Sequence, residues 1–307
     1  GATGDDNDQI ISPIVADLGD VDSGSIEAMI DFAQWGAEHF PADRYAFVIW
    51  NHGWSWSFVD GPQMGVLKGI SDDESTGNSI SIANGEYEDM LIAINQALGG
   101  KIELLGSDAC IMQAWEVATI AEPYANYYVA SQDYESAEGW NYNDSMLDLI
   151  SNPDWNGEQL GYSIAERFYQ TGDLTQSVVD LSKIQEFNQR LNNFAQTLMD
   201  EQMVQAYAYA LNSIYSYDGQ WGVDRDLGGI LEAFSESNSQ PTRDAAASAL
   251  ETYNQMITSN FTRSYAEDAT GLSIYSPQPN WGSPDNDYMR ASWSQDSLWD
   301  DWLDYAH

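Results

Sequence analysis

The sequence predicts a three-layer α/β fold with a mainly parallel central sheet and a helix-rich C-terminal part. Short continuous runs of apolar, aromatic and β-branched residues, such as YAFVIW at 45–50, are typical of buried strands. Segments with apolar residues at helical spacing separate these runs along the chain. Because strands that alternate with helices favour parallel pairing, these observations together predict helices on both faces of one sheet.

The expected elements follow each other in a simple order. Strands are expected at 45–50, 102–106, 127–131, 175–181 and 271–276. Helices are expected at 23–38, 87–98, 111–122, 143–151, 157–170, 183–203, 225–236, 240–258 and 295–305. Residues 60–84, rich in Gly, Asp and Ser, are expected to form a long loop.

No internal repeat or clean linker divides the chain. The division is therefore inferred from the point, near residue 183, at which alternating strands and helices give way to mostly helical sequence. We expect a core over residues 1–182 and a helix-rich part over 183–307. The second part is expected to return one strand, at 271–276, to the core and not to fold independently.

The charge of the chain excludes several classes of function. Its 49 Asp and Glu residues against 10 Lys and Arg give a net charge of -39, which repels nucleic-acid phosphates and anionic lipid headgroups. No apolar run approaches the roughly 20 residues of a membrane span. The chain opens without an initiator Met or a signal-peptide pattern, so we expect a mature or truncated form. An acidic, Lys-poor chain of this kind favours a secreted, extracellular protein.

The only cysteine, Cys110, and one of three histidines, His52, follow two of the expected strands. Because ligands bind outside the carboxyl ends of strands in open α/β sheets, the two side chains meet if their strands are neighbours. A helix beginning near Ile111 would favour the thiolate of Cys110, and His52 could serve as base and acid. The N–H of the following Gly53 could donate to an oxyanion.

The residues alone leave other readings open. A lone cysteine is usually a small buried hydrophobe, and a lone histidine is usually a satisfied hydrogen-bonding residue. His39 closes an expected surface helix and His307 ends the chain, so no zinc-ligand cluster is expected. The 12 Trp and 18 Tyr residues beside many carboxylates would also suit a carbohydrate-active or carbohydrate-binding protein.

Five segments, in order, resemble the clostripain family of cysteine peptidases. They are YAFVIWNHGWSW, IELLGSDACIMQAWEVA, YANYYVASQDYESAEGWNYNDSM, TQSVVDLSKIQEFNQRLNNFAQTL and ATGLSIYSPQ, and the resemblance covers most of residues 11–305. It implies a caspase-like α/β/α sandwich, shared with gingipains and legumains. It also implies an endopeptidase that cleaves after Arg or Lys through a thioester acyl-enzyme. An inactive peptidase-fold binding protein is the alternative.

The resemblance implies roles for individual residues. The family's nucleophile maps to Cys110 and its general base to His52, with backbone N–H groups of Gly53 and Cys110 as the oxyanion hole. Asp108, two residues before the nucleophile, would form the floor of the specificity pocket, where a carboxylate suits a guanidinium or ammonium group. Glu138, just before a Gly-Trp pair, is the candidate second acid. The plainer readings are a loop or cap acid for Asp108 and an exposed loop carboxylate for Glu138.

The resemblance also bears on activation, ions and partners. Family members are commonly activated by self-cleavage after a basic residue between His and Cys, which predicts a cut after Lys68, in the long loop, rather than Lys101. No cofactor is required by the sequence; calcium is a candidate because some members depend on it, but no metal ligands are predicted. Family catalytic domains usually begin with a further strand and helix, so we also expect a separate N-terminal chain or pro-segment as a partner, beside protein or peptide substrates with basic residues.

Overall fold

The central feature of the molecule is one five-stranded sheet. The computed structural model describes residues 13–56, 69–172, 175–217, 223–280, 282 and 284–307. The strands are β1 (Ala46–Trp50), β2 (Ile102–Asp108), β3 (Ala125–Ala130), β4 (Thr175–Asp180) and β6 (Ile257–Thr262). Their order in the sheet is β1-β2-β3-β4-β6. The four strands expected in the first 182 residues therefore all form and lie side by side.

The expectation of a mainly parallel sheet is only partly right, because the sheet is mixed. β1, β2 and β3 are parallel, whereas β3 pairs antiparallel with β4, and β4 pairs antiparallel with β6. The cause is the pair of helices between β3 and β4, α4 (Tyr142–Ser151) and α5 (Gly157–Thr171). The first begins beside Asp108, at the carboxyl end of β2, and the second begins beside Glu103, near its start. The two helices run in opposite directions and bring the chain back to the edge of the sheet at which β3 ends. β4 therefore starts at that edge and runs opposite to β3.

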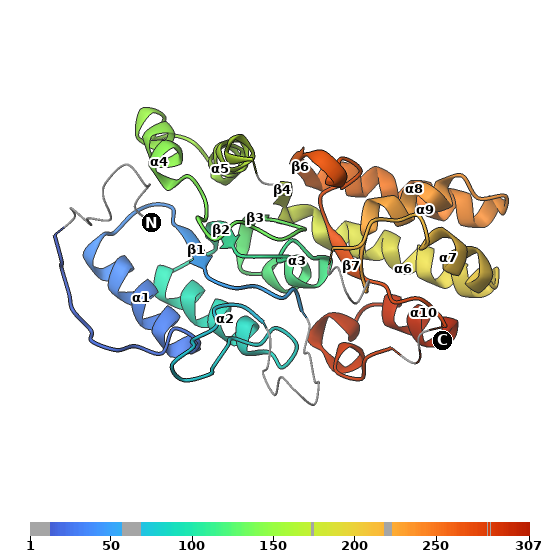
Figure 1. Cartoon of the computed structure of the whole chain (residues 1–307), viewed down its shortest axis with the longest axis horizontal. Coiled ribbons are helices and arrows are strands. Elements are labelled where there is room, and N and C mark those ends of the chain that lie inside the picture. The colour runs from blue at the N-terminus through green and yellow to red at the C-terminus, as the bar shows by residue number, and fades with distance from the viewer. Residues whose placement is uncertain (1–12, 57–68, 173–174, 218–222, 281, 283) are drawn as a thin grey trace.

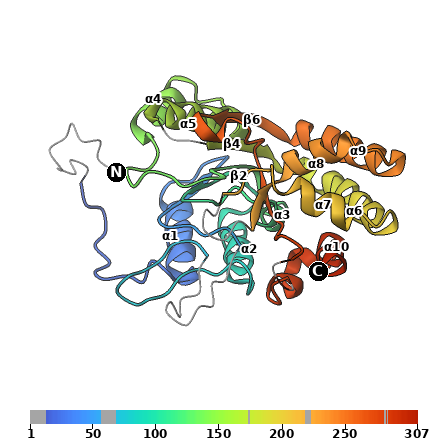
Figure 2. The ribbon, with the colours of Figure 1, turned by 45° about the vertical axis from the view of Figure 1, so that its right-hand side comes forward.

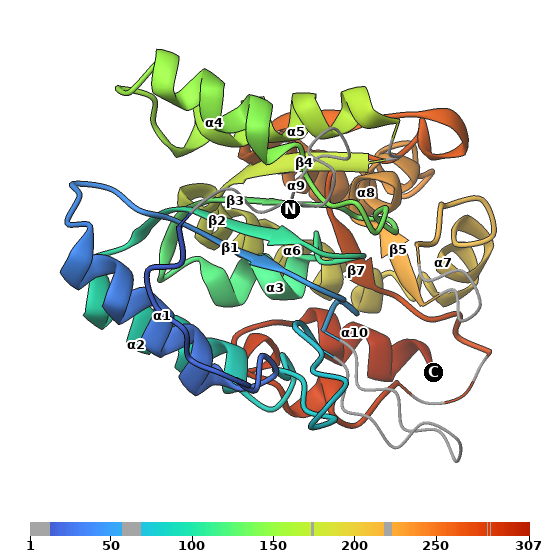
Figure 3. The ribbon, with the colours of Figure 1, turned by 60° about the vertical axis from the view of Figure 1, so that its left-hand side comes forward.

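Helices cover both faces of the sheet, as Figure 3 shows. On one face, α5 packs Leu160, Ile164 and Phe168 against side chains of β2, β3 and β4. On the other face lie α1 (Ile26–His39), α2 (Glu86–Leu98) and α3 (Trp115–Ala121). Successive strand residues point to opposite faces, so Leu104 and Leu105 of β2 belong to different cores. The three expected layers are therefore present.

The C-terminal half extends sideways from this sandwich as a group of helices (Figures 1 and 2). The helices are α6 (Ile184–Asp200), α7 (Val204–Ala210), α8 (Leu227–Ser235), α9 (Gln240–Met256) and α10 (Trp299–Ala306). Short 3₁₀ helices lie at Leu181–Lys183, Ser264–Ala266, Tyr288–Arg290 and Ser292–Ser294. In the described parts of the chain, no helix is both long and apolar enough to cross a bilayer.

The strand expected at 271–276 forms as β7 (Ser273–Tyr275), but it does not add to the five-stranded sheet. It pairs antiparallel with β5 (Asp224–Asp226) in a separate two-stranded sheet. The N–H of Ser273 donates to the carbonyl of Gln113 at 3.0 Å, so this small sheet contacts the turn between β2 and α3. The C-terminal strand of the central sheet is instead β6, whose sequence, ITSNFT, overlaps the end of the helix expected at 240–258 and carried no strand prediction.

Candidate active site

The ends of β1 and β2 place the two expected catalytic side chains on the same edge of the sheet. In the parallel register, Trp50 is opposite Asp108, so His52 and Cys110 each lie two residues beyond a paired position. Both residues line one cavity of about 420 Å³, together with Asp108 and Glu135. The side chain of His52 is solvent-exposed and Cys110 is half-buried. This placement agrees with the sheet-edge argument from the sequence.

Gly53 packs directly against the backbone that carries the thiol. A Cβ atom on Gly53 would lie 2.6 Å from the carbonyl oxygen of Cys110 and 2.9 Å from the Cβ of Ala109. Such distances are shorter than van der Waals contact, so only glycine fits. A short antiparallel bridge to Ile70 holds Gly53 in place. Its N–H therefore lies on the segment that contacts the nucleophile position, as an oxyanion-hole donor would require.

The helix expected near Ile111 begins four residues later, which corrects the argument for the thiolate. Ile111 has a φ of 49°, a left-handed conformation that is costly for a β-branched residue, and α3 starts only at Trp115. The chain makes a turn after Cys110 instead of entering a helix. The contact on sulfur comes from the loop after β3, where the N–H of Glu135 donates to Sγ at 3.3 Å. A local hydrogen bond, rather than a helix N-terminus, lies next to the thiol.

Asn51 fixes the backbone before His52 rather than its ring. Its Oδ1 accepts the N–H of His52 at 2.6 Å and the N–H of Asp72 at 3.0 Å. The carbonyl of His52 also accepts the N–H of Ser71 at 3.1 Å. These bonds join the end of β1 to the 71–78 loop, which belongs to the long loop expected at 60–84.

Asp108 is held at the base of the cavity with its carboxyl group largely withdrawn from water. The residue is 2% exposed, and its Oδ2 accepts the N–H of Trp140 at 3.0 Å and the hydroxyl of Tyr142 at 2.7 Å. Burial raises the pKa of Asp108, and these two hydrogen bonds oppose the effect. The backbone of Gly139, with a φ of 68°, packs against this carboxyl group. A Cβ atom on Gly139 would lie 2.9 Å from Oδ2 of Asp108. The carboxyl group of Asp108 is therefore enclosed at the wall of the cavity, and it is not an exposed loop acid.

The structure brings Glu135, not Glu138, next to Asp108. Glu135 lines the cavity, and Trp140 contacts both acids: its backbone N–H donates to Oδ2 of Asp108 at 3.0 Å and its indole N–H donates to Oε1 of Glu135 at 3.4 Å. Burial raises the pKa of Glu135 well above its ordinary range, and the nearby charge of Asp108 adds to this. Glu138 is exposed and is not among the residues lining the cavity. Both belong to the acidic loop DYESAE, and only the fold distinguishes them.

Two further acids of the cavity were not singled out from the sequence. Asp72 and Glu74 line it from the 71–78 loop, and Oδ2 of Asp72 accepts the indole N–H of Trp54 at 3.3 Å. The neighbouring Asp73 anchors this loop to the start of α1, because its Oδ2 accepts the N–H of Ser23 at 2.9 Å. The signal available in the sequence was the Asp-rich composition of the loop, which is shared by much of this acidic chain.

Lys68, the expected self-cleavage position, lies outside the described residues, which resume at Gly69. No group of three or more His, Cys, Asp or Glu side chains that could hold a metal ion occurs within the described ranges.

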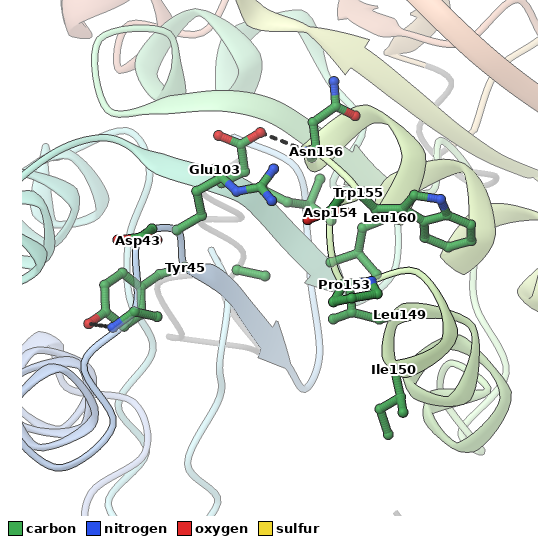
Figure 4. Close-up of a pocket in the computed structure, with 15 residues that line it drawn as sticks. Asp43, Tyr45, Glu103, Leu149, Ile150, Pro153, Asp154, Trp155, Asn156 and Leu160 are labelled. Atoms are coloured by element: carbon green, nitrogen blue, oxygen red, sulfur yellow. Dashed lines mark hydrogen bonds between the residues drawn. The ribbon is translucent and has the colours of Figure 1, made fainter.

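A second cavity, of about 510 Å³, lies at the opposite end of β1 and β2 (Figure 4). Tyr45 and Glu103 line it from the strand starts, and Trp155 lines it from the turn between α4 and α5. One carboxylate oxygen of Glu103 accepts the N–H of Gly157 at 2.8 Å, which fixes the start of α5. Among the described residues that line it there is neither histidine nor cysteine. The chemistry expected from the sequence therefore belongs to the first cavity.

Comparisons with known proteins find relatives of this chain. Clostripain from Hathewaya histolytica is 25% identical over 83% of this chain. The chain spans 57% of the length of that relative.

Solved structures of C11 proteases share the fold. A secreted C11 cysteine protease from Bacteroides thetaiotaomicron, in complex with an irreversible peptide inhibitor, superposes with a TM-score of 0.65 at 20% identity, covering 91% of this chain and 79% of that one. An inactive zymogen C11 protease from Parabacteroides distasonis gives a TM-score of 0.62 at 18% identity, covering 92% and 78%. The model of the Clostripain family, Peptidase C11, matches residues 4–305, and the chain therefore belongs to this family.

Proposed function

We propose that this chain is a cysteine endopeptidase that cleaves peptide bonds after Arg or Lys. The observation that carries the proposal is the shared cavity, which is lined by the buried Asp108 together with His52 and Cys110. A carboxylate at the base of a pocket pairs with a guanidinium or ammonium group and disfavours neutral side chains. The cationic residue before the scissile bond would thereby hold the carbonyl carbon near the thiol.

The reaction proceeds in two halves under this proposal. His52 takes the thiol proton, and the sulfur of Cys110 attacks the carbonyl carbon while the oxyanion is held by backbone N–H groups of Gly53 and Cys110. The tetrahedral intermediate collapses to a thioester as His52 protonates the leaving amine. Water, deprotonated by His52, then attacks the thioester and releases the new carboxyl end and the thiol.

Turnover of matched reporter peptides tests the proposal. Initial rates would be measured on peptides ending in Arg, Lys, Ala or Asp, with and without calcium, beside a Cys110→Ala control. Cleavage of the Arg and Lys reporters that disappears in the control is the expected result. Cleavage of the Ala or Asp reporter would keep the dyad but refute the role of Asp108. Peptide cleavage that survives Cys110→Ala would refute cysteine catalysis.

We further propose activation by a cut after Lys68 and action outside the cell. The relative from Bacteroides thetaiotaomicron is described as a secreted protease, and the strongly acidic composition supports the same setting for this chain. Mass spectrometry of the intact protein over time is expected to show one cut after Lys68 that is absent in Lys68→Gln and in Cys110→Ala. A cut elsewhere would refute the assignment of the activation site.

A further inference from the structure

The loop after β3 brings a second carboxylate to the cavity and attaches it to the nucleophile. The backbone N–H of Glu135 donates to Sγ of Cys110 at 3.3 Å, and its side chain shares Trp140 as a hydrogen-bond donor with Asp108. The indole N–H of Trp140 approaches Oε1 of Glu135 at 3.4 Å. Oε2 is buried and accepts no hydrogen bond from the described residues. A buried carboxylate oxygen without a donor, at the wall of a cavity, is left to be compensated by a proton or by a ligand.

Two carboxyl groups this close cannot both carry a full charge while the cavity is empty. Like charges in a shared, poorly hydrated site hold one proton between them. The other titratable groups around the pair are Tyr142, which donates to Asp108, and the remaining lining groups of the cavity, Cys110, His52, Asp72 and Glu74. Among these, only His52 can supply a positive charge. The pair is therefore left to be neutralised by a proton or by a cationic ligand.

We propose that Glu135 is the second acid of the specificity pocket, and that a cationic substrate side chain displaces the one proton that Asp108 and Glu135 share. The inference deepens the proposed function and rests on it. When an Arg or Lys side chain enters, it brings its own proton and positive charge, and the shared proton leaves to solvent. The pocket then holds two carboxylates and one cation. A neutral side chain cannot trigger this exchange, so it meets a protonated, uncharged pair.

The pH dependence of binding follows from this exchange. Over the range in which the empty pair keeps its proton, binding releases one proton, so the affinity for a cation rises up to tenfold for each pH unit. KM for Arg and Lys reporters is therefore expected to fall as pH rises and then level off. In Glu135→Gln no shared proton remains, so KM should lose this slope and, at high pH, should lie about tenfold or more above that of the wild type.

The test compares Glu135→Gln with two matched variants between pH 5.5 and 8.5. Glu138→Gln, three residues along the same loop, tests the assignment made from the sequence. Glu38→Gln, exposed on α1, makes the same change of net charge far from the cavity. Loss of the KM slope in Glu135→Gln alone supports the proposal. Loss in Glu138→Gln, or an unchanged slope in Glu135→Gln, overturns it.

A second readout does not depend on turnover. Benzamidine, a small amidinium cation, should protect Cys110 from alkylation by iodoacetamide, with protection that strengthens as pH rises in the wild type but not in Glu135→Gln. The alkylation rate without benzamidine should be alike in both forms, because the hydrogen bond to sulfur comes from the backbone. A large change in that rate would overturn the proposal by showing that Glu135 acts through the thiol. If every reporter is silent while benzamidine protection keeps its pH slope, the peptidase proposal fails and this inference stands.

Discussion

Glu116, in the first turn of α3, gives the sharpest prediction about stability. It is fully buried, and its Oε1 accepts the N–H of Tyr275 at 2.9 Å and the hydroxyl of Tyr288 at 2.9 Å. Oε2 has no partner among the described residues. Burial raises the pKa of Glu116 from its ordinary value of 4.5 to about 7, against the effect of these hydrogen bonds.

The sign of the resulting pH effect follows from proton binding. Between pH 4.5 and 7 the unfolded chain loses the Glu116 proton while the folded protein keeps it. The free energy of unfolding therefore falls as pH rises through this window and is constant, for this group, on either side. At about 1.4 kcal/mol per pH unit, the full loss is roughly 3 kcal/mol. Glu116→Gln, which stays neutral, removes this loss.

Equilibrium urea unfolding at pH 4, 5, 6, 7 and 8 measures the effect, with both proteins in a Cys110→Ala background to prevent self-cleavage. The difference in unfolding free energy between Glu116→Gln and its parent should move in favour of the glutamine by roughly 3 kcal/mol across the series. Because the other titratable groups are the same in both proteins, their contributions to the pH dependence cancel in this difference. A difference that stays constant with pH would refute the account of a buried, protonated Glu116.

Three further substitutions test the site and its supports. Gly53→Ala forces a methyl group against the carbonyl of Cys110, and kcat should fall about 100-fold while circular dichroism stays unchanged; near-normal kcat would show that the contact can relax. Gly139→Ala crowds Asp108 and must adopt a left-handed φ, so KM for the Arg reporter should rise with little change in kcat; a loss confined to kcat would contradict this. Asp73→Ala removes the acceptor between its loop and the start of α1, and hydrogen exchange there should accelerate; unchanged protection would show that the anchor is dispensable.

The sequence predicted the strands of the first half because each is a short apolar, β-branched run. It could not give the direction of β4, since that depends on the two helices α4 and α5 crossing the sheet in opposite senses. β6 was missed because ITSNFT is polar, only partly buried and directly continuous with α9. In each case the deciding information is tertiary.

The candidate site also combines features that local sequence predicts with features that only the tertiary structure decides. His52, Cys110 and Asp108 stand at fixed offsets from strand ends, so an argument from the strands alone could bring them together. Glu135 and Glu138 are three residues apart in one acidic loop, and their different surroundings depend on how that loop folds over Asp108. The turn at Ile111 was also hidden, because an apolar residue before a helical pattern reads as part of the helix.

The contacts between the two halves of the chain limit how this family could be recombined. The carboxylate of Glu116, in the first turn of α3, accepts hydrogen bonds from Tyr275 and Tyr288. The side chain of Gln132, just before the acidic loop, donates to Asp226 and accepts the N–H of Gly271. These partners are polar, buried and mutually specific. A chimera that exchanged the C-terminal half with that of a relative would therefore need these glutamine and glutamate positions exchanged as well. Without these exchanges, we expect the graft to misplace both the turn after Cys110 and the acidic loop at 133–138.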